Sequence, residues 1–321
     1  MKKRLHTLCF ATIVFLVASL QSVSAWAEKR IGFLMFSDET RYTEAAKGIK
    51  DKLSEAGYTD SNTHYIIEKA GANKAKAVEL VQNFAGEKLD IIIALGTSST
   101  VIAAKQFKSV PIVFSVVYDP VDAGIAKSWK SSGNNTTGSS SKVPMVEVLN
   151  NLKLLRPVNR LAVLYTAGEK NSESTLTDLQ KTQAKAGIKI IPVLITTNED
   201  IDQLLPEVLH TVDGLYITGS NLVNSRIDTI VDMATRAGVI TVSHLEDLIE
   251  KGVLVGVCAD SYTVGRLAGD KAVRILHGAK PSSLPIDVLT NFDVILNMKT
   301  VKKGKFQIPS AFMNTVTRTI Q

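Results

Sequence analysis

The sequence predicts an α/β fold of two Rossmann-like lobes with parallel sheets, joined by a hinge of three chain crossings. Its 321 residues suit two lobes of about 150 residues each better than one hydrophobic core. Hydrophobic residues make up 45% of the chain and charged residues 21%, as in soluble globular proteins, which argues against a disordered or polytopic membrane protein. An internal repeat, and short apolar runs that alternate with helical patterns, support the rest of the prediction.

The first 27 residues have the order of a secretory signal peptide. Three basic residues at positions 2–4 precede an apolar run over residues 8–20, and small residues follow in Ala25-Trp26-Ala27. The apolar run is shorter than the roughly 20 residues that span a bilayer, so we predict cleavage after Ala27 and export to the periplasm. A signal anchor that stays uncut is the alternative.

The composition of the mature chain argues against several kinds of binding partner and against a disulfide. Loss of the three basic residues lowers the formal net charge from +6 to +3, and no run of five basic residues follows, so we expect no nucleic-acid partner. Cys258 becomes the single cysteine, which excludes an internal disulfide. No second ligand stands at metal-binding spacing from His244, so we expect neither a metal nor another cofactor.

Two parts of the sequence repeat at an offset of 130 residues. Arg30–Met35 and Arg160–Tyr165 each predict a strand that is followed by a long helical pattern. Both helical patterns end at a glycine, Gly57 in the first half and Gly187 in the second. Glycine is the expected residue after a helix, so the stop signals repeat along with the hydrophobic pattern.

The repeat continues with further strands in each half. Leu89–Thr97 and Val212–Ser220 each place an Asp before an apolar run and a hydroxyl residue after its glycine, and Val110–Ser115 and Val239–Ser243 supply the next strand. Short apolar strands between helical patterns are typical of parallel sheets buried on both faces. Ligands of such sheets collect beyond the carboxyl ends of the strands, so two facing lobes would share one cleft.

The C-terminal part is predicted to cross between the lobes. We expect a strand over Val253–Ala259, a helix over Ser261–His277 and a strand over Ile286–Asn297. The three crossings are placed near Ser140, Asp260 and Phe292. They assign residues 28–140 and 260–292 to lobe I, and residues 141–259 and 293–321 to lobe II.

Hydroxyl residues follow one predicted strand of the first half. Thr97, Ser98 and Ser99 lie at the start of a helix, where hydroxyls and free backbone N–H groups can bind a carboxylate. Plain N-capping is the alternative, although one hydroxyl suffices for a cap. Tyr118 and Asp119 end the next strand, where Tyr118 could contact an apolar group and Asp119 could either accept a ligand ammonium or form an Asp-Pro turn.

The crossings and the second lobe contribute further ligand-binding candidates. Ser140 lies at the first crossing, and Asp260 lies at the second, where it could bind a cationic group or cap the following helix. Strand ends and turns of the second lobe place six more polar or aromatic side chains at the cleft: Tyr165, Asn171, Ser172, Ser220, Asn221 and His244.

Catalytic signatures are mostly absent from the sequence. It contains no dinucleotide fingerprint, P-loop, nucleophile elbow or HExxH pair. Ser139-Ser140-Ser141-Lys142 fits the SxxK pattern, but the companion motifs of that enzyme class are missing. We therefore expect a binding protein, and an exported serine hydrolase that uses Ser139 and Lys142 is the alternative.

Motifs that resemble those of one known protein family extend over nearly the whole mature chain. The most specific are DPVDAG at Asp119–Gly124 and GEKNS at Gly168–Ser172, beside LDIIIALGTSSTVIAAK and the closing LNMKTVKKGKFQIP. They resemble the ABC-transporter substrate-binding proteins of the type I periplasmic-binding-protein fold, whose best-known members bind aromatic amino acids such as tryptophan. The resemblance implies ligand contacts by Thr97 to Ser99, Asp119, Asn171, Ser172, Ser220, Asn221 and Asp260.

The chain departs from this family pattern at two places. Gly219-Ser220-Asn221 stands where members usually carry Thr-Asp-Asn, which removes an acid suited to an ammonium group, and Thr166-Ala167 replaces Asn-Pro. The fold implied by the resemblance is unaffected by these changes, whereas the identity of the ligand stays open.

Together these observations predict the periplasmic solute-binding component of an ABC importer. It would bind an amino acid or a related compound in the interlobe cleft by lobe closure, as a monomer, and deliver it to an inner-membrane permease with its ATPase. A receptor that presents its bound state to a membrane sensor kinase or chemoreceptor is an alternative, because the docking surface carries no readable motif.

Overall fold

The computed structural model describes residues 28–321, and the predicted signal peptide lies outside the described residues. The first lobe consists of β1 (Lys29–Met35), α1 (Thr40–Glu55), β2 (Thr63–Lys69), α2 (Lys74–Phe84), β3 (Ile91–Leu95), α3 (Thr97–Gln106), β4 (Ile112–Val117), β5 (Thr136–Ser140), α10 (Ser261–Leu276), the 3-10 turn η1 (Pro281–Ser283) and β11 (Asp287–Val288). The second consists of α4 (Met145–Leu155), β6 (Arg160–Tyr165), α5 (Lys170–Ala186), β7 (Lys189–Leu194), α6 (Asn198–Leu209), β8 (Gly214–Ile217), α7 (Asn221–Asn224), α8 (Ile227–Arg236), β9 (Ile240–Ser243), α9 (Glu246–Glu250), β10 (Val255–Cys258), β12 (Asp293–Asn297), α11 (Met298–Gly304), α12 (Ser310–Met313) and β13 (Arg318–Ile320).

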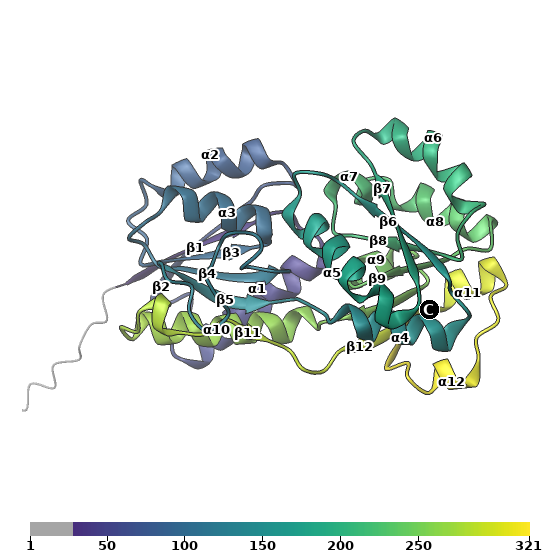
Figure 1. Cartoon of the computed structure of the whole chain (residues 1–321). Coiled ribbons are helices and arrows are strands. Elements are labelled where there is room, and N and C mark those ends of the chain that lie inside the picture. The colour runs from purple at the N-terminus through teal and green to yellow at the C-terminus, as the bar shows by residue number, and fades with distance from the viewer. Residues whose placement is uncertain (1–27) are drawn as a thin grey trace, which may run out of the picture.

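Each lobe is built on one mainly parallel sheet, and the two lobes lie side by side (Figure 1). The first sheet has the strand order β11-β5-β4-β3-β1-β2 with parallel neighbours throughout. The second has the order β13-β12-β10-β9-β8-β6-β7 and is parallel except between β10 and β12. The predicted α/β fold is therefore confirmed. Among the described helices, none combines the length and apolar character needed to cross a bilayer.

Both faces of each sheet are buried, as the apolar runs predicted. In β3, Ile91 and Ile93 pack in the cluster that contains side chains of α1 and α10, whereas Ile92 packs with side chains of α2 and α3. All three isoleucines are fully buried. Figure 1 shows α2 and α3 on one side of this sheet and α10 on the other. A strand buried on both faces has no polar side to present, which explains its unbroken apolar sequence.

The internal repeat is visible in the hydrogen bonds that begin each sheet. Asp90 accepts a hydrogen bond from the backbone N–H of Arg30 at 2.8 Å, and Asp213 accepts one from the backbone N–H of Arg160 at 2.9 Å. Each Asp stands before the strand that pairs with the first strand of its lobe, β3 beside β1 and β8 beside β6, and fixes the start of that first strand. Gly187 ends α5 in the left-handed conformation with φ +66°, as predicted from the sequence.

The chain passes between the two sheets three times within residues 28–321: after β5, after β10 and after β11. The prediction of one strand over Ile286–Asn297 was wrong. β11 pairs with β5 in the first sheet and β12 pairs with β10 in the second, so residues 289–292 form the third crossing instead of strand. An apolar run alone does not show which sheet each half of it joins.

Helices α1 and α10 pack unusually closely against each other. A Cβ atom added to Gly265 would lie 2.2 Å from the carbonyl oxygen of Ala45, and one added to Gly48 would lie 2.2 Å from the carbonyl oxygen of Tyr262. Both obstacles are backbone atoms, which side-chain rotation cannot move. This contact holds α1 in place, and α1 carries residues of the site described below.

We expect Gly265→Ala to lower the free energy of unfolding by about 1–3 kcal/mol, because the added methyl group overpacks the contact. Urea unfolding monitored by circular dichroism measures the change. Gly86→Ala is the matched control, since the nearest heavy atom to its added Cβ is 3.6 Å away. Equal stability of the two variants would show that α10 moves aside without cost.

Candidate functional site

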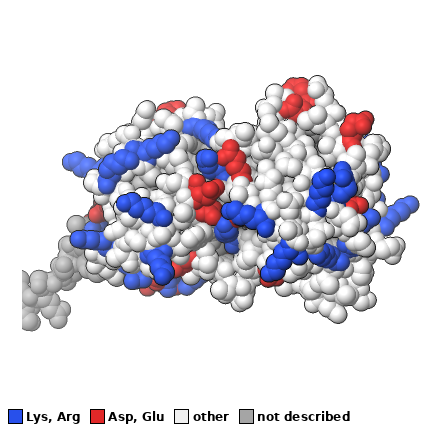
Figure 2. All heavy atoms as spheres, viewed as in Figure 1, with Lys and Arg blue, Asp and Glu red and all other residues white. Residues whose placement is uncertain are grey.

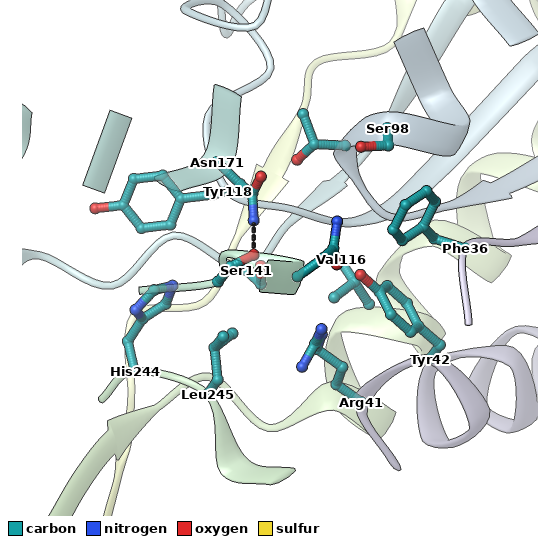
Figure 3. Close-up of a pocket in the computed structure, with 13 residues that line it drawn as sticks. Phe36, Arg41, Tyr42, Ser98, Val116, Tyr118, Ser141, Asn171, His244 and Leu245 are labelled. Atoms are coloured by element: carbon teal, nitrogen blue, oxygen red, sulfur yellow. Dashed lines mark hydrogen bonds between the residues drawn. The ribbon is translucent and has the colours of Figure 1, made fainter. Parts of the chain in front are cut away.

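A cavity lies between the two lobes at the carboxyl ends of their strands (Figure 3). Its free volume in this structure is about 20 Å³. Its walls come from both lobes and from the first crossing: Phe36, Arg41, Tyr42, Thr97, Ser98, Val116, Tyr118, Ser141, Asn171, Gly219, Asn221, His244 and Leu245. This is where parallel sheets are expected to bind ligands.

The N-terminus of α3 forms one wall of this cavity. The first helical hydrogen bond runs from the N–H of Thr100 to the carbonyl of Gly96, so within the described chain the N–H groups of Thr97, Ser98 and Ser99 have no partner. Thr97 is 7% exposed, and its hydroxyl also makes no hydrogen bond within residues 28–321. Ser99 is fully buried behind this wall. The free N–H groups and the helix dipole create a site for an anion.

The opposite walls are aromatic and apolar. Phe36, Tyr42, Tyr118 and His244 contribute rings, and Figure 3 shows them placed around the cavity. Tyr42 approaches the backbone so closely that a Cβ at position 96 would lie 2.9 Å from its ring, which requires Gly96. Such walls suit a flat or apolar ligand group.

Val116 reaches the cavity from a strained backbone position. Its φ is +56°, a conformation that costs a β-branched residue on the order of 1–3 kcal/mol. The strain coincides with a register shift between β4 and β5, between Phe114 and Val117. This register shift lies at the end of β4, between the segment after β3 that carries Thr97 and the segment after β5 that carries Ser141.

His244 is buried and neutral. Burial, and then the positive charge of Arg41, lower the pKa of His244 to about 3. Its Nδ1 lies 2.7 Å from the hydroxyl of Tyr216, and burial raises the pKa of that tyrosine well above its usual value. Tyr216 therefore keeps its proton and shares a hydrogen bond with Nδ1, and its hydroxyl also lies 3.5 Å from the sulfur of Met145. Within the described chain Nε2 has no partner, so it is available to a bound molecule.

Arg41 connects the two lobes at the cavity wall. Its Nη1 lies 2.5 Å from Oδ2 of Asp247, which belongs to α9 of the second lobe, and its Nη2 pairs with Glu39. The guanidinium carbon also lies 4.7 Å from the centre of the Tyr42 ring. Burial lowers the pKa of Arg41, but the charges of Asp247 and Glu39 outweigh this effect and raise it well above its usual value. Arg41 therefore stays charged although it is buried.

A second polar cluster, the hinge cluster of Tyr118, Asp119, Lys142 and Asp178, joins the lobes beside the first crossing. Lys142 lies 2.7 Å from Asp119 of the first lobe and 2.5 Å from Asp178 on α5 of the second. The hydroxyl of Tyr118, whose ring lines the cavity, donates to Asp178 at 3.2 Å. Lys74 also donates across the cleft to the carbonyl of Gly168 at 3.2 Å. These contacts bridge the two lobes in this structure.

Six of the predicted ligand-binding residues line the cavity: Thr97, Ser98, Tyr118, Asn171, Asn221 and His244. Asn171 donates through Nδ2 to the carbonyl oxygen of Gly219 at 2.6 Å, shown by the dashed line in Figure 3. The structure thus brings together side chains from two strand ends and three helix N-termini, as the topology predicts.

Two predicted acids form local contacts instead of lining the cavity. Asp119 accepts hydrogen bonds from the N–H groups of Val121 and Asp122, both at 3.0 Å. Asp260 accepts one from the N–H of Thr263 at 2.8 Å and caps α10. These are the turn and the cap that the sequence left open as alternatives. A ligand-binding role for either acid stays a prediction.

The other predicted residues lie behind the cavity surface. Ser140 donates to the carbonyl of Tyr118 at 2.6 Å, Ser172 shares a hydrogen bond of 2.6 Å with Thr218, and Ser220 caps α7. Tyr165 packs against the core of the second lobe, and the hydroxyl oxygen of Ser99 has no partner within residues 28–321. The hydroxyls of Ser140, Ser172 and Ser220 hold the chain segments that shape the site.

Sequence reasoning missed seven residues of the cavity wall: Phe36, Arg41, Tyr42, Val116, Ser141, Gly219 and Leu245. Phe36, Arg41 and Tyr42 follow the end of β1. The rule that ligands collect at strand ends located residues after the other strands, and it would have located these three if it had been applied to β1 as well. Arg41 is the most consequential omission, because it is the one charged residue among the cavity-lining residues of the described chain.

The residues of the hydrolase alternative are engaged elsewhere. Ser139 donates to the carbonyl of Val264 at 2.7 Å, and Lys142 forms ion pairs with the two Asp residues of the hinge cluster. Burial lowers the pKa of Lys142, but hydrogen bonds and charges from Asp119 and Asp178 raise it overall, which is the wrong direction for a general base. In the part of the chain that the structure describes, no group of three or more His, Cys, Asp or Glu could hold a metal ion.

Buried, neutral His244 should make stability depend on pH. The unfolded chain binds a proton at this residue below about pH 6.5, whereas the folded chain does so only near pH 3, so stability falls as the pH decreases from 6.5. Between pH 7 and pH 5 this residue should account for about 2 kcal/mol of lost stability.

Urea unfolding at the two pH values measures this effect. His244→Asn should reduce the loss by that amount, while His210→Asn, which changes an exposed histidine, should leave it as in the wild type. An identical pH dependence in wild type and His244→Asn would show that folding does not lower the pKa of His244.

Comparison with known proteins is consistent with this geometry. The chain is 26% identical over 286 residues to a tyrosine-binding protein of Clostridioides difficile, which covers 88% of this chain and 83% of that protein. A Streptococcus pneumoniae ABC domain in complex with L-Trp superposes with a TM-score of 0.85 at 23% identity, over 91% of this chain and all of that one. The ligand-free, open structure of a substrate-binding protein with adhesive properties from Clostridium difficile gives a TM-score of 0.73 at 27% identity, over 90% and 98% of the two chains.

A family model described as ABC transporter substrate binding protein matches residues 30–320. This match spans both lobes, the three crossings and every residue of the cavity wall. By this match the chain belongs to the ABC transporter substrate-binding protein family.

Proposed function

We propose that this protein is the periplasmic solute-binding component of an ABC importer. It binds an amino acid or a related compound between its lobes, without converting it chemically, and presents the closed form to an inner-membrane permease with its ATPase. The observation that carries the proposal is the interlobe cavity, in which the free N-terminus of α3 faces a set of aromatic walls. The protein acts as a monomer in this proposal.

The two ends of the cavity suit the two ends of such a ligand. The N–H groups of Thr97, Ser98 and Ser99 offer hydrogen bonds to a carboxylate, each worth about 1.5–3 kcal/mol when charge-assisted. The rings of Tyr42 and Tyr118 offer apolar surface to the rest of the molecule. A dissociation constant of 1 μM needs about 8 kcal/mol, which these contacts can supply after ordering costs. Relatives described as binding tyrosine or in complex with L-Trp support this class of ligand.

Closure supplies the signal that the permease would detect. Arg41 and Asp247 come from different lobes, as do Tyr118 and Asp178, so both contacts depend on the distance between the lobes. A ligand shifts the protein toward the closed form only by as much as it binds that form more tightly. The cavity is lined from both lobes, so the full set of ligand contacts exists only in the closed form. The surface in Figure 2 intersperses basic and acidic side chains on the face shown, which fits a small-molecule receptor.

Thr97→Val tests the α3 site directly. It removes a cavity hydroxyl and keeps the side-chain volume, so we expect the affinity for a bound amino acid or related compound to fall roughly tenfold, about 1.4 kcal/mol. Isothermal titration calorimetry measures the affinity. Thr177→Val, on the exposed face of α5, is the matched control and should bind as the wild type does.

The proposal as a whole is tested by calorimetric titration of the mature protein with a panel of amino acids and related carboxylates. A bound compound should also raise the ATPase rate of the permease complex reconstituted with this protein. Folded protein that binds no member of the panel, or that releases a chemically altered product, contradicts the proposed function.

A further inference from the structure

We propose that the second lobe carries another ligand site, a groove at its outer end that binds an amphipathic anion, a molecule with an apolar chain or ring and one phosphate or carboxylate group. The groove lies at the amino ends of the strands, before β6 and β9, whereas the interlobe cavity lies at the carboxyl ends. Figure 1 shows α11 and α12, which border the groove, at the end of the second lobe that points away from the first. The inference therefore goes beyond the proposed function.

The walls of this groove are largely apolar. Its free volume is about 540 Å³, within the range of roughly 300–1,000 Å³ that is usual for ligand pockets. Leu154, Leu155, Ile240 and Phe306 contribute apolar side chains, and Leu154 is 43% exposed. The ring of Phe306 packs against the backbone of Gly304, where an added Cβ atom would lie 2.3 Å from it. The groove thus offers a shaped apolar surface that is open to solvent.

Three cations stand around this apolar surface. Lys153, Arg156 and Lys305 belong to the lining, and within residues 28–321 the lining includes no Asp or Glu. None of the three forms an ion pair with another residue of the described chain. The groove therefore carries positive charge that the protein leaves unbalanced.

The nearest helix does not supply the missing acid. Asp232 lies on α8, which ends just before the groove, but it is already paired with Lys303 at 2.9 Å and with Arg236. Its single charge is shared between two cations, so none of it is left for the lining.

Helix capping does not account for the two lysines. Cations are favourable at helix C-termini, and α4, α8 and α11 all end at the groove. Carbonyl groups in the last turns of α8 and α11 already accept backbone hydrogen bonds from the residues that follow each helix, and Arg156 donates to the carbonyl oxygen of Gly238 at 3.1 Å. The ammonium groups of Lys153 and Lys305 make no hydrogen bond within the part of the chain that the structure describes.

The backbone at Lys305 gives a second indication that its side chain has a use. Its φ is +52°, in the left-handed region that favours Gly or Asn after a helix. The backbone there gives no reason for a lysine. The side chain instead adds a cation to the rim of the groove.

These features match a ligand with two parts. A phosphate or carboxylate would form charge-assisted hydrogen bonds with the lysines, and an apolar chain or ring would cover Leu154 and Phe306. A cation would be repelled, and an anion without an apolar part would leave the apolar surface exposed to water.

Calorimetric titration of the mature protein with octyl phosphate, inorganic phosphate and octyltrimethylammonium tests the site. We expect octyl phosphate, kept below its micelle concentration, to bind at least tenfold more tightly than inorganic phosphate, and octyltrimethylammonium not to bind. Octyl phosphate that binds no more tightly than inorganic phosphate, or a cation that binds as tightly, overturns the inference.

Vesicles distinguish the two sources of such a ligand. Phosphatidylcholine vesicles with and without phosphatidylglycerol are sedimented with the mature protein. Retention by the anionic vesicles alone would identify the ligand as a membrane lipid, and no retention, with octyl phosphate bound, would identify it as a soluble amphiphile.

A double variant places the binding in the groove. Lys153→Gln with Lys305→Asn removes two charges, and Asn suits the backbone at position 305. It should bind octyl phosphate at least tenfold more weakly. The control Lys105→Gln with Lys130→Asn removes two charges from exposed positions of the first lobe and should stay within twofold of the wild type. Unchanged binding by the groove variant, or an equal loss in both variants, contradicts the assignment.

A variant of the apolar wall tests the other half of the site. Leu154→Gln should weaken octyl phosphate binding at least threefold, while Leu204→Gln, which changes an equally exposed leucine on α6, should not. Equal affinity in both variants would show that the apolar part of the ligand does not contact the groove. Binding in the interlobe cavity should be the same in all of these variants, so failure of this inference is distinguishable from failure of the proposed function.

Discussion

A charged pair buried between the two lobes connects them in this structure. Arg41 and Asp247 are 4% and 2% exposed at their side chains, and each would face the cost of an unpaired buried charge if the other were absent. They belong to helices of different lobes, α1 and α9, so the pair forms only when the lobes approach. Arg41 also lines the cavity, so one side chain takes part both in the contact between the lobes and in the cavity wall.

The hinge cluster extends this coupling to the opposite side of the cavity. Tyr118 presents its ring to the cavity and its hydroxyl to Asp178 of the second lobe, while Lys142 connects Asp178 with Asp119. A ligand that orders the Tyr118 ring thereby stabilises a contact between the lobes. His244 packs edge-to-face against that ring at 5.1 Å and is held by Tyr216 from behind. The cavity wall is a continuous set of contacts from one lobe to the other.

The sequence predicted the features that arise from local patterns. Strand ends followed by hydroxyl or amide residues were located because parallel sheets expose their carboxyl ends together, and this placed Thr97, Asn171 and His244 at the cavity. Contacts between residues that are far apart in the sequence could not be predicted from these patterns. Arg41 and Asp247 are separated by 206 positions, and nothing in either local sequence indicates the other. Local patterns also left Asp119 and Asp260 undecided between capping and binding, because both roles need the same residue at the same place.

Small-angle X-ray scattering of the mature protein, first stripped of ligand and then saturated with its tightest-binding compound, tests the central claim most directly. The account predicts that saturation reduces the radius of gyration and gives a profile that matches the closed structure, and that Asp247→Asn, still bound, closes less completely. An identical profile before and after saturation in the wild type would contradict it.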